Sequence, residues 1–181
     1  MKYIPFIIAL FILWSCSDLG RSKQLMAIDN MNKSLDSIQS VLKENEIDTL
    51  AALRVATNSV EIRIKNYYDA DTIDMAFGKK MDAYKVMRRQ LGSLSKNYSV
   101  IKNGVTDERV TLKNLKSDID KGYGDRNKYD EYVMHEESKV QQLRVLLKAY
   151  VEDKNKTMAE FHRLHDELYA FSISLLEKNK K

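Results

Sequence analysis

The chain has 181 residues, of which 30 are basic and 26 acidic, so its formal net charge is +4. This length predicts one domain of ordinary size, and so mild a charge does not indicate nucleic acid as a partner. One proline, six glycines and one cysteine leave few helix breakers and no internal disulfide, and no segment alternates as a strand does. We therefore expect an all-α protein whose fold rests on packing alone.

The first 16 residues, MKYIPFIIALFILWSC, differ in character from the rest. Lys2 precedes an apolar run at 4–13, which is too short for a membrane-spanning helix of about 20 apolar residues. A charged start followed by such a run is typical of a secretory signal peptide. The alternatives are the start of a core helix, which Pro5 and the abrupt polarity after Cys16 disfavour, and an uncleaved anchor, which the short run disfavours.

The end of this run resembles a lipobox, the cleavage site of bacterial lipoproteins. Leu13 matches the aliphatic residue three before the cysteine, and Ser15 matches the small residue directly before Cys16. Trp14 stands where a small residue is usual. The resemblance implies cleavage before Cys16, a diacylglycerol on its sulfur and acylation of the new N-terminus. It also implies a location in the bacterial cell envelope, with the chain anchored to a membrane and facing the periplasm or the exterior.

We interpret the polar segment at 17–22 as a short tether and predict a helical bundle domain for 23–178. Its first helix is predicted at 23–44 and its second at 49–68, each with apolar residues spaced alternately by three and four. The two apolar faces are out of phase by one residue, so the chain must break between them. A break this short predicts an antiparallel helical hairpin. The expected inward-facing residues are Ile28, Met31, Leu35, Ile38 and Leu42, then Leu50, Leu53, Thr57, Val60, Ile64 and Tyr67.

A third helix is predicted at 73–102 and a fourth at 106–121, because Gly104 suits the C-cap of the third. Gly78 and Gly92 inside the third helix fit either a close helix crossing or tolerated surface positions. The apolar faces of these two helices are predicted to comprise Phe77, Met81, Tyr84, Met87, Leu91, Leu94, Tyr98 and Ile101, then Leu112, Leu115 and Ile119.

The segment Gly122-Tyr123-Gly124 predicts a turn, and the last helix should start near Asp125. Its apolar residues keep the same spacing of three and four positions before and after the polar residues Lys154 and Thr157. We therefore predict one helix of about 50 residues, the longest in the chain, rather than a new helix capped at Thr157. The whole fold is predicted to be an elongated antiparallel bundle of about five helices with coiled-coil-like packing. The apolar face of the last helix is predicted to comprise Tyr129, Tyr132, Val140, Leu143, Leu147, Tyr150, Phe161, Leu164, Leu168, Phe171 and Leu175.

Two groups of side chains are candidates for metal binding or catalysis. His162 and His165 lie three residues apart and could hold zinc or iron, but neither points along the apolar face, and the Glu-x-x-His pairs of di-iron bundles are absent from the sequence. A group of carboxylates could serve acid–base catalysis, but no nucleophile, oxyanion donor or phosphate-binding glycine loop accompanies it. We therefore predict no catalytic site, metal or cofactor. The carboxylates are Asp130, Glu131, Glu136 and Glu137.

The predicted third helix is the most polarised segment, with seven basic and two acidic residues. Lys85, Arg89 and Lys96 share a face that could meet anionic headgroups, an acidic polymer or an acidic partner, and a solvated face with some acidic neighbours is the alternative. Tyrosines on or beside the apolar faces could line a groove for a glycan or peptide, although such residues more often belong to the core. They are Tyr84, Tyr98, Tyr129, Tyr132 and Tyr150.

The sequence thus predicts a non-catalytic cell-envelope lipoprotein with a binding or scaffolding role. The alternatives are a small-ligand or metal-binding bundle around His162 and His165, and an enzyme that uses the carboxylates. The membrane is the expected partner through lipid on Cys16, and another envelope protein, an anionic polymer or a second copy of the chain stays open. The predicted docking surface surrounds Lys154, whose ammonium should reach water where the shorter helices no longer cover the last one.

Overall fold

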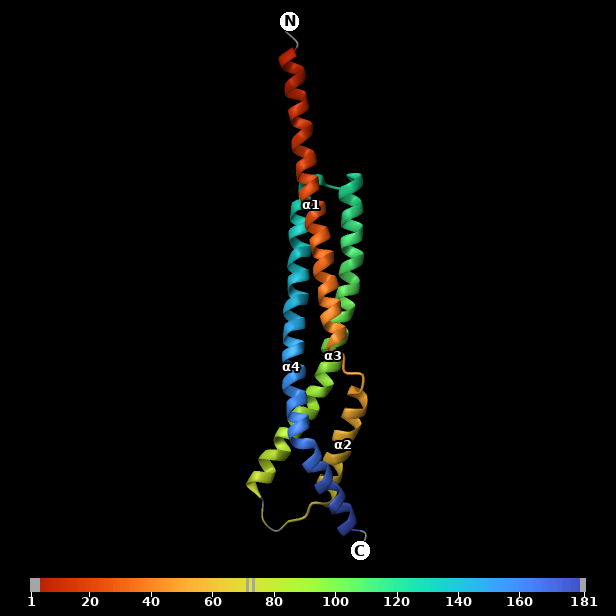
Figure 1. The fold of residues 1–181 in the computed structure, drawn as a ribbon, viewed down its shortest axis with the longest axis vertical. Helices are drawn as coiled ribbons and strands as arrows, with labels where there is room; N and C mark the ends of the chain where they lie inside the picture. Colours follow the sequence, from red (N-terminus) through yellow and green to blue (C-terminus); the bar gives the residue numbers. More distant parts are fainter. Residues whose placement is uncertain (1–3, 71, 73, 180–181) are drawn as a thin grey trace. The chain divides into compact units, whose positions relative to one another are not determined.

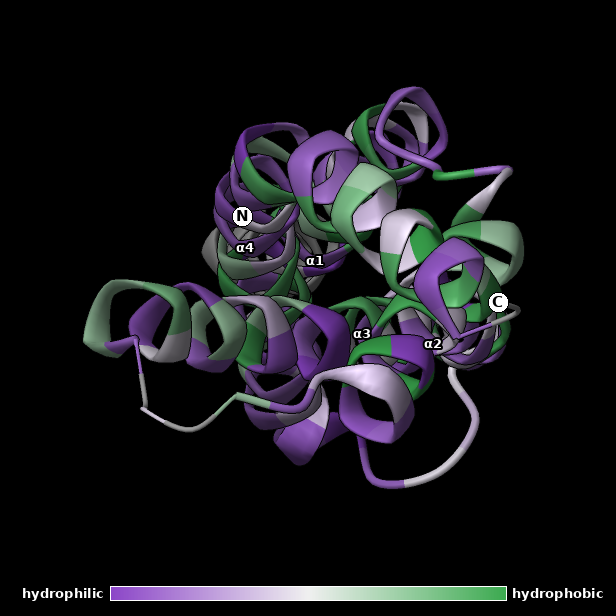
Figure 2. Ribbon diagram, turned by 90° about the horizontal axis from the view of Figure 1, so that it is seen from below, coloured by the Kyte–Doolittle hydropathy of each residue, from purple (hydrophilic) through white to green (hydrophobic). Residues whose placement is uncertain are grey.

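The computed structural model describes residues 4–70, 72 and 74–179, with side chains from Leu19 onward. This described part contains four α-helices, a short 3₁₀ helix and no strand. The helices are α1 (Ile4–Glu44), α2 (Leu50–Tyr67), α3 (Met75–Lys121), η1 (Arg126–Lys128) and α4 (Tyr129–Lys178), as Figure 1 shows. The all-α prediction is confirmed, and α4 is the longest helix at 50 residues. Hydrophobic and hydrophilic residues occur on every helix, as expected of helices with one buried face (Figure 2).

The first of two compact units consists of α1 together with Ile101–Val145, which supplies the second part of α3 and the first part of α4. In this unit α1 runs antiparallel to α3, because Asp29 pairs with Lys116 and the later Asp36 pairs with the earlier Arg109, both at 2.6 Å. The inward face predicted for the first helix is buried throughout. The core of the unit comprises Ile28, Met31, Leu35, Ile38, Leu42, Ile101, Val105, Leu112, Ile119, Tyr129, Val133, Val140 and Leu143.

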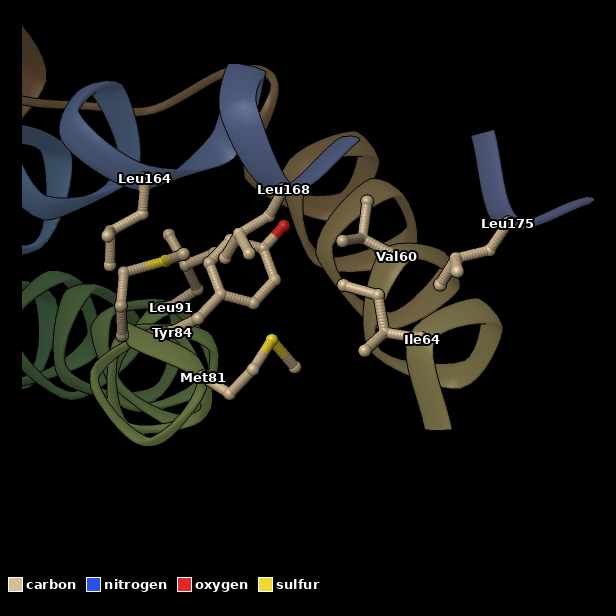
Figure 3. Packing of buried hydrophobic residues seen from close by; sticks show 9 residues of the cluster. Val60, Ile64, Met81, Tyr84, Leu91, Leu164, Leu168 and Leu175 are labelled. Atoms are coloured by element: carbon tan, nitrogen blue, oxygen red, sulfur yellow. The ribbon is translucent and has the colours of Figure 1, made fainter. Parts of the chain in front are cut away.

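The second unit consists of Asn45–Val100 and the last part of α4, from Leu146 onward. In this unit α3 runs antiparallel to α4, because Tyr84 contacts His165 whereas the later Gln90 contacts the earlier Thr157. Side chains from α2, α3 and α4 point toward one another in its core (Figure 3). This core comprises Val60, Ile64, Met81, Tyr84, Met87, Leu91, Leu164, Leu168 and Leu175. The bundle predicted as one domain therefore packs as two units that share α3 and α4.

The antiparallel hairpin predicted for the first two helices does not form within one unit, because the structure assigns α1 to the first unit and α2 to the second. Within its own unit, α1 runs in the same direction as the α4 segment that it meets, and so does the segment from Asn45 through α2. The hydrogen-bonded pairs that establish this are Gln24–Asp130 and Ser34–Arg144 in the first unit, and Asn45–Tyr150 and Arg63–Ser172 in the second.

The prediction of separate third and fourth helices is also wrong, because α3 continues through Gly104 without a break. The physical reason is a side chain from another helix. A Cβ built on Gly104 would lie only 2.7 Å from Cδ2 of Leu143, so this glycine admits a buried leucine of α4 rather than ending a helix. Gly78 and Gly92 are not sites of close helix crossing, since a Cβ at Gly78 would meet nothing within 4 Å and one at Gly92 would meet only the Arg54 side chain, at 3.9 Å.

The turn before α4 and the continuity of α4 agree with the sequence. Gly122 and Gly124 have φ angles of 70° and 79°, a left-handed backbone conformation that glycine adopts readily. Asp125 then accepts a hydrogen bond from the Asn127 N–H at 3.1 Å and caps η1. The predicted inward position of Tyr132 is wrong, because this side chain is exposed and the neighbouring Val133 is buried in its place.

Candidate functional site

The predicted lipidation site, Cys16, falls in the backbone range of α1, but its side chain lies outside the described residues. The segment 17–22, interpreted as a tether, is helical backbone at the same end of α1, and Arg21 within it pairs with Asp120 of α3 at 2.6 Å. None of the helices in the described part has a stretch long and apolar enough to cross a membrane. Lipid attachment at Cys16 therefore stays a prediction from the sequence.

The two histidines considered as metal ligands have different surroundings. His162 is exposed, whereas His165 is half-buried, stacks on Phe161 with ring centroids 4.5 Å apart, and places Nδ1 2.7 Å from the Tyr84 hydroxyl. Burial lowers the pKa of His165. Among the described residues, no group of three or more His, Cys, Asp or Glu side chains could hold a metal ion. His165 is thus a packing and hydrogen-bonding residue of the second unit, more buried than the sequence predicted.

The candidate carboxylates do not form one cluster. Asp130, Glu131 and Glu137 are exposed, and Asp130 accepts a hydrogen bond from Gln24 at 2.8 Å. Only Glu136 is buried. A second buried carboxylate, Glu108 of α3, shares Lys139 with Glu136. Glu108 was not among the predicted residues, although its 3-4 spacing from the buried Ile101, Val105 and Leu112 could have identified it.

Glu108, Glu136 and Lys139 form a buried charge cluster in the first unit. Lys139 Nζ lies 2.8 Å from Glu108 Oε2 and 2.5 Å from Glu136 Oε2, so one ammonium serves two carboxylates. The second oxygen of Glu108, Oε1, is buried without a hydrogen-bond partner. Burial raises the pKa of Glu108, and the hydrogen bond and charge of Glu136 raise it further against the opposing effect of Lys139. This arrangement pairs two buried carboxylates with one partly exposed ammonium.

The three residues of the basic face predicted for 73–102 all lie on α3, but their surroundings differ. Lys85 lies 3.7 Å from Asp82, so one of its three members has an acidic neighbour. Arg89 and Lys96 are exposed on α3. Arg54 of α2 adds a further positive charge beside this face, since its side chain packs over Gly92 of α3. The residue spacing did not predict this, because Arg54 lies on a different helix.

Arg54, Arg88 and Arg89 line a hollow of about 480 Å³ between α2 and α3, which we call the arginine hollow. Arg88 Nε donates to Glu61 Oε2 at 2.6 Å, and its Nη1 lies 3.4 Å from Asn58 Oδ1. The remaining lining residues are Ala51, Val55, Asn58 and Gly92, so the described residues contribute no carboxylate to the lining.

A second hollow, which we call the apolar pocket, lies farther along the same helix pair and has a volume of about 440 Å³. Asp74 caps α3 beside it, since its Oδ1 accepts hydrogen bonds from the N–H groups of Ala76 and Phe77 at 2.8 and 3.2 Å. The rings of Tyr68 and Phe77 lie 4.8 Å apart and help to form the wall. The apolar lining is Ile64, Tyr68, Ala70, Phe77 and Met81, and the charged lining is Glu61, Lys65, Asp74, Asp82 and Lys85.

The tyrosines considered for a glycan or peptide groove belong mainly to the cores. Tyr84, Tyr129 and Tyr150 are buried, whereas Tyr98 is half-buried and Tyr132 is exposed. The Tyr150 hydroxyl donates to the Asn45 carbonyl at 2.8 Å, and burial raises the pKa of Tyr150 to about 12. The hydroxyls of Tyr84, Tyr129 and Tyr150 therefore make hydrogen bonds inside the units.

The structure also tests the docking surface predicted around Lys154. This lysine is half-buried, and its Nζ donates to Asn45 Oδ1 at 2.6 Å. Thr157, one turn later, is buried beside Gln90 at 3.4 Å. The segment after α1 therefore covers part of this face through Asn45, and the ammonium has a protein partner as well as access to water.

Comparison with protein-family models, with curated proteins and with solved structures found no match to this chain.

Proposed function

We propose that this chain is a cell-envelope lipoprotein, anchored to a bacterial membrane by lipid on Cys16, whose helical units serve a non-catalytic binding or scaffolding role. The observation that carries the proposal is the N-terminal sequence. Lys2, the apolar run at 4–13 and the Ser15-Cys16 pair occur in the order and spacing of a lipoprotein signal. One acyl chain holds a protein to a membrane only reversibly, so the two or more chains of a lipidated cysteine would suffice for stable attachment.

The experiment compares wild type with the Cys16→Ala variant after expression in a bacterium. We expect wild type to sediment with the membranes and to remain there in high salt, and the variant to lose this retention. Ser17→Ala, which changes the neighbouring residue and leaves the cysteine, is the matched control and should behave as wild type. Equal membrane retention of wild type and Cys16→Ala would contradict lipid anchoring.

A second candidate function, the binding of a small apolar ligand, is favoured by the apolar pocket. Its volume of about 440 Å³ falls within the range of about 300–1,000 Å³ usual for small-molecule sites. Its apolar wall with a charged rim suits a ligand with a hydrophobic body and one polar end.

Gly78 provides a test of this second candidate, because it lines the pocket and a Cβ there would meet nothing within 4 Å. Gly78→Leu should fill the pocket without disturbing α3, and Gly78→Ala is the control that adds a methyl group only. Indole is titrated into the full chain while NMR follows the Met81 methyl group. We expect a shift at Met81 in wild type and Gly78→Ala and none in Gly78→Leu. The same shift in Gly78→Leu, or no shift in wild type, would contradict the binding of an apolar ligand in this pocket.

A further inference from the structure

We propose that the arginine hollow is a binding site for a phosphate group, held by Arg54 of α2 and Arg89 of α3. The inference concerns the second unit alone, and it does not depend on whether Cys16 carries lipid. It rests on the charges of the lining, on the fit of Arg54 over Gly92 and on the size of the hollow.

The charge balance of the hollow is positive. Among the described residues, its lining holds three guanidinium groups and no carboxylate. Only one of the three is neutralised, because Glu61 pairs with Arg88 at 2.6 Å. Within the described part of the chain, Arg54 and Arg89 have no ion-pair partner and are exposed. Two positive charges are therefore available to a ligand.

The Glu61–Arg88 pair also orders the site. Arg88 is held by Glu61 and by Asn58, so its guanidinium has a defined position in the lining of the arginine hollow. Arg54 is positioned differently. Its guanidinium lies against the backbone of α3 at Gly92, where the atoms Nη2, Cζ and Nε are 3.9–4.0 Å from the place of a Cβ. Arg54 and Arg89 thus line the same hollow from two different helices.

Phosphate fits these features better than a single carboxylate does. A phosphate monoester carries about −1.5 to −2 charges at pH 7, which matches two unpaired guanidiniums. The planar fork of arginine donates two parallel hydrogen bonds to phosphate oxygens, which gives both strength and orientation. A volume of about 480 Å³ exceeds what a phosphate alone requires, and Val55, 68% exposed, offers apolar contact to the organic part of the ligand. The ligand class is therefore a phosphorylated small molecule or a phospholipid headgroup; the phosphodiester of a headgroup carries one negative charge and still offers two oxygens to the guanidinium groups.

The test uses the full chain in a neutral detergent and isothermal titration calorimetry with two probes. Phenyl phosphate represents a soluble monoester with an apolar body, and glycerophosphoglycerol represents the headgroup of phosphatidylglycerol. The variants are Arg54→Gln and Arg89→Gln. The control is Arg163→Gln, which removes the same charge from an exposed arginine of the same unit that pairs with Glu160 at 2.6 Å. Circular dichroism checks that each variant keeps its helix content.

We expect each hollow variant to weaken binding of the preferred probe about tenfold or more, the effect typical of a lost charge-assisted hydrogen bond, and the control to change it less than about twofold. Tighter binding of phenyl phosphate than of glycerophosphoglycerol would indicate that the natural ligand is a soluble phosphorylated molecule. Tighter binding of glycerophosphoglycerol would indicate a phospholipid headgroup. Gly92→Glu supplies an independent check, because a carboxylate beside Arg54 should compete with the ligand and weaken binding similarly. Binding of neither probe, or equal weakening in the hollow variants and in Arg163→Gln, would overturn the proposal.

Discussion

Replacing Lys139 with methionine tests the energetics of the buried charge cluster. The Glu108 and Glu136 side chains are 3% and 11% exposed, so both carboxylates are nearly removed from water. Lys139→Met keeps a chain of similar length but leaves the two carboxylates facing each other without a cation. Glu108→Gln is the contrasting change, because it removes one negative charge and leaves the Lys139–Glu136 pair in place.

The magnitude follows from burial. Breaking a buried ion pair by removing one partner costs about 3–5 kcal/mol of stability. The Lys139 side chain is 39% exposed, so water replaces part of the lost interaction and the expected cost falls to about 2–3 kcal/mol at pH 7. The wild-type cluster holds two carboxylates and one ammonium. Glu108→Gln leaves one carboxylate and one ammonium, so the net charge of the cluster becomes zero. This variant should change the free energy of unfolding by less than about 1 kcal/mol.

The pH dependence of the variants provides a second readout. The pKa of Glu108 is raised above its ordinary value of 4.5, so the folded state binds the proton more tightly than the unfolded state. Stability from this group is present below pH 4.5 and is lost as pH rises through the folded-state pKa. The deficit of Lys139→Met should therefore shrink as pH is lowered from 7 toward 4.5, because protonation of Glu108 removes the repulsion.

The assay is urea unfolding followed by circular dichroism at each pH. A cost below about 0.5 kcal/mol for Lys139→Met at pH 7 is what surface substitutions show, and it would refute the assignment of a buried cluster. An equal cost for Glu108→Gln and Lys139→Met would also refute the reasoning, because only the lysine change leaves an unpaired buried charge.

The remaining stability predictions use the same unfolding assay. Leu164→Ala should cost about 2–5 kcal/mol, because this side chain is fully buried in the core of the second unit, and a cost below 1 kcal/mol would contradict that packing. Gly104→Val should cost about 1–3 kcal/mol by overpacking against Leu143, and a stabilised variant would show that the approach is not close. His165→Ala should destabilise because it leaves the buried Tyr84 hydroxyl without its partner. The lowered pKa of His165 means that its contribution is present above pH 6.5 and lost as pH falls, so the variant should show a weaker acid dependence than wild type.

The local pattern of the sequence predicts the helices and their buried faces well. The five positions of the first helix face, from Ile28 to Leu42, are all buried, and α4 continues through Lys154 as its phase predicts. This works because burial on a helix repeats every three or four residues, whichever neighbour does the covering. Glu108 and Glu136 follow the same rule, because they lie at positions in register with the buried apolar residues and are themselves buried.

The pairing of the helices could not be predicted, because it depends on contacts far apart in the chain. Gly104 has the local signature of a helix end, and only the presence of Leu143, from another helix, explains why it lies inside α3. The arginine hollow has the same origin. Arg89 was recognised as part of a basic face, but Arg54 belongs to a different helix, and nothing in the spacing of either indicates that they line one hollow.

The most direct test of the proposed function is the intact mass of the protein purified from bacterial membranes. We expect a chain that begins at Cys16, with the mass of residues 16–181 plus a diacylglycerol and an acyl group, and with both modifications on the N-terminal cysteine peptide after digestion. A chain that retains Met1–Ser15 and carries an unmodified Cys16 would contradict lipid anchoring.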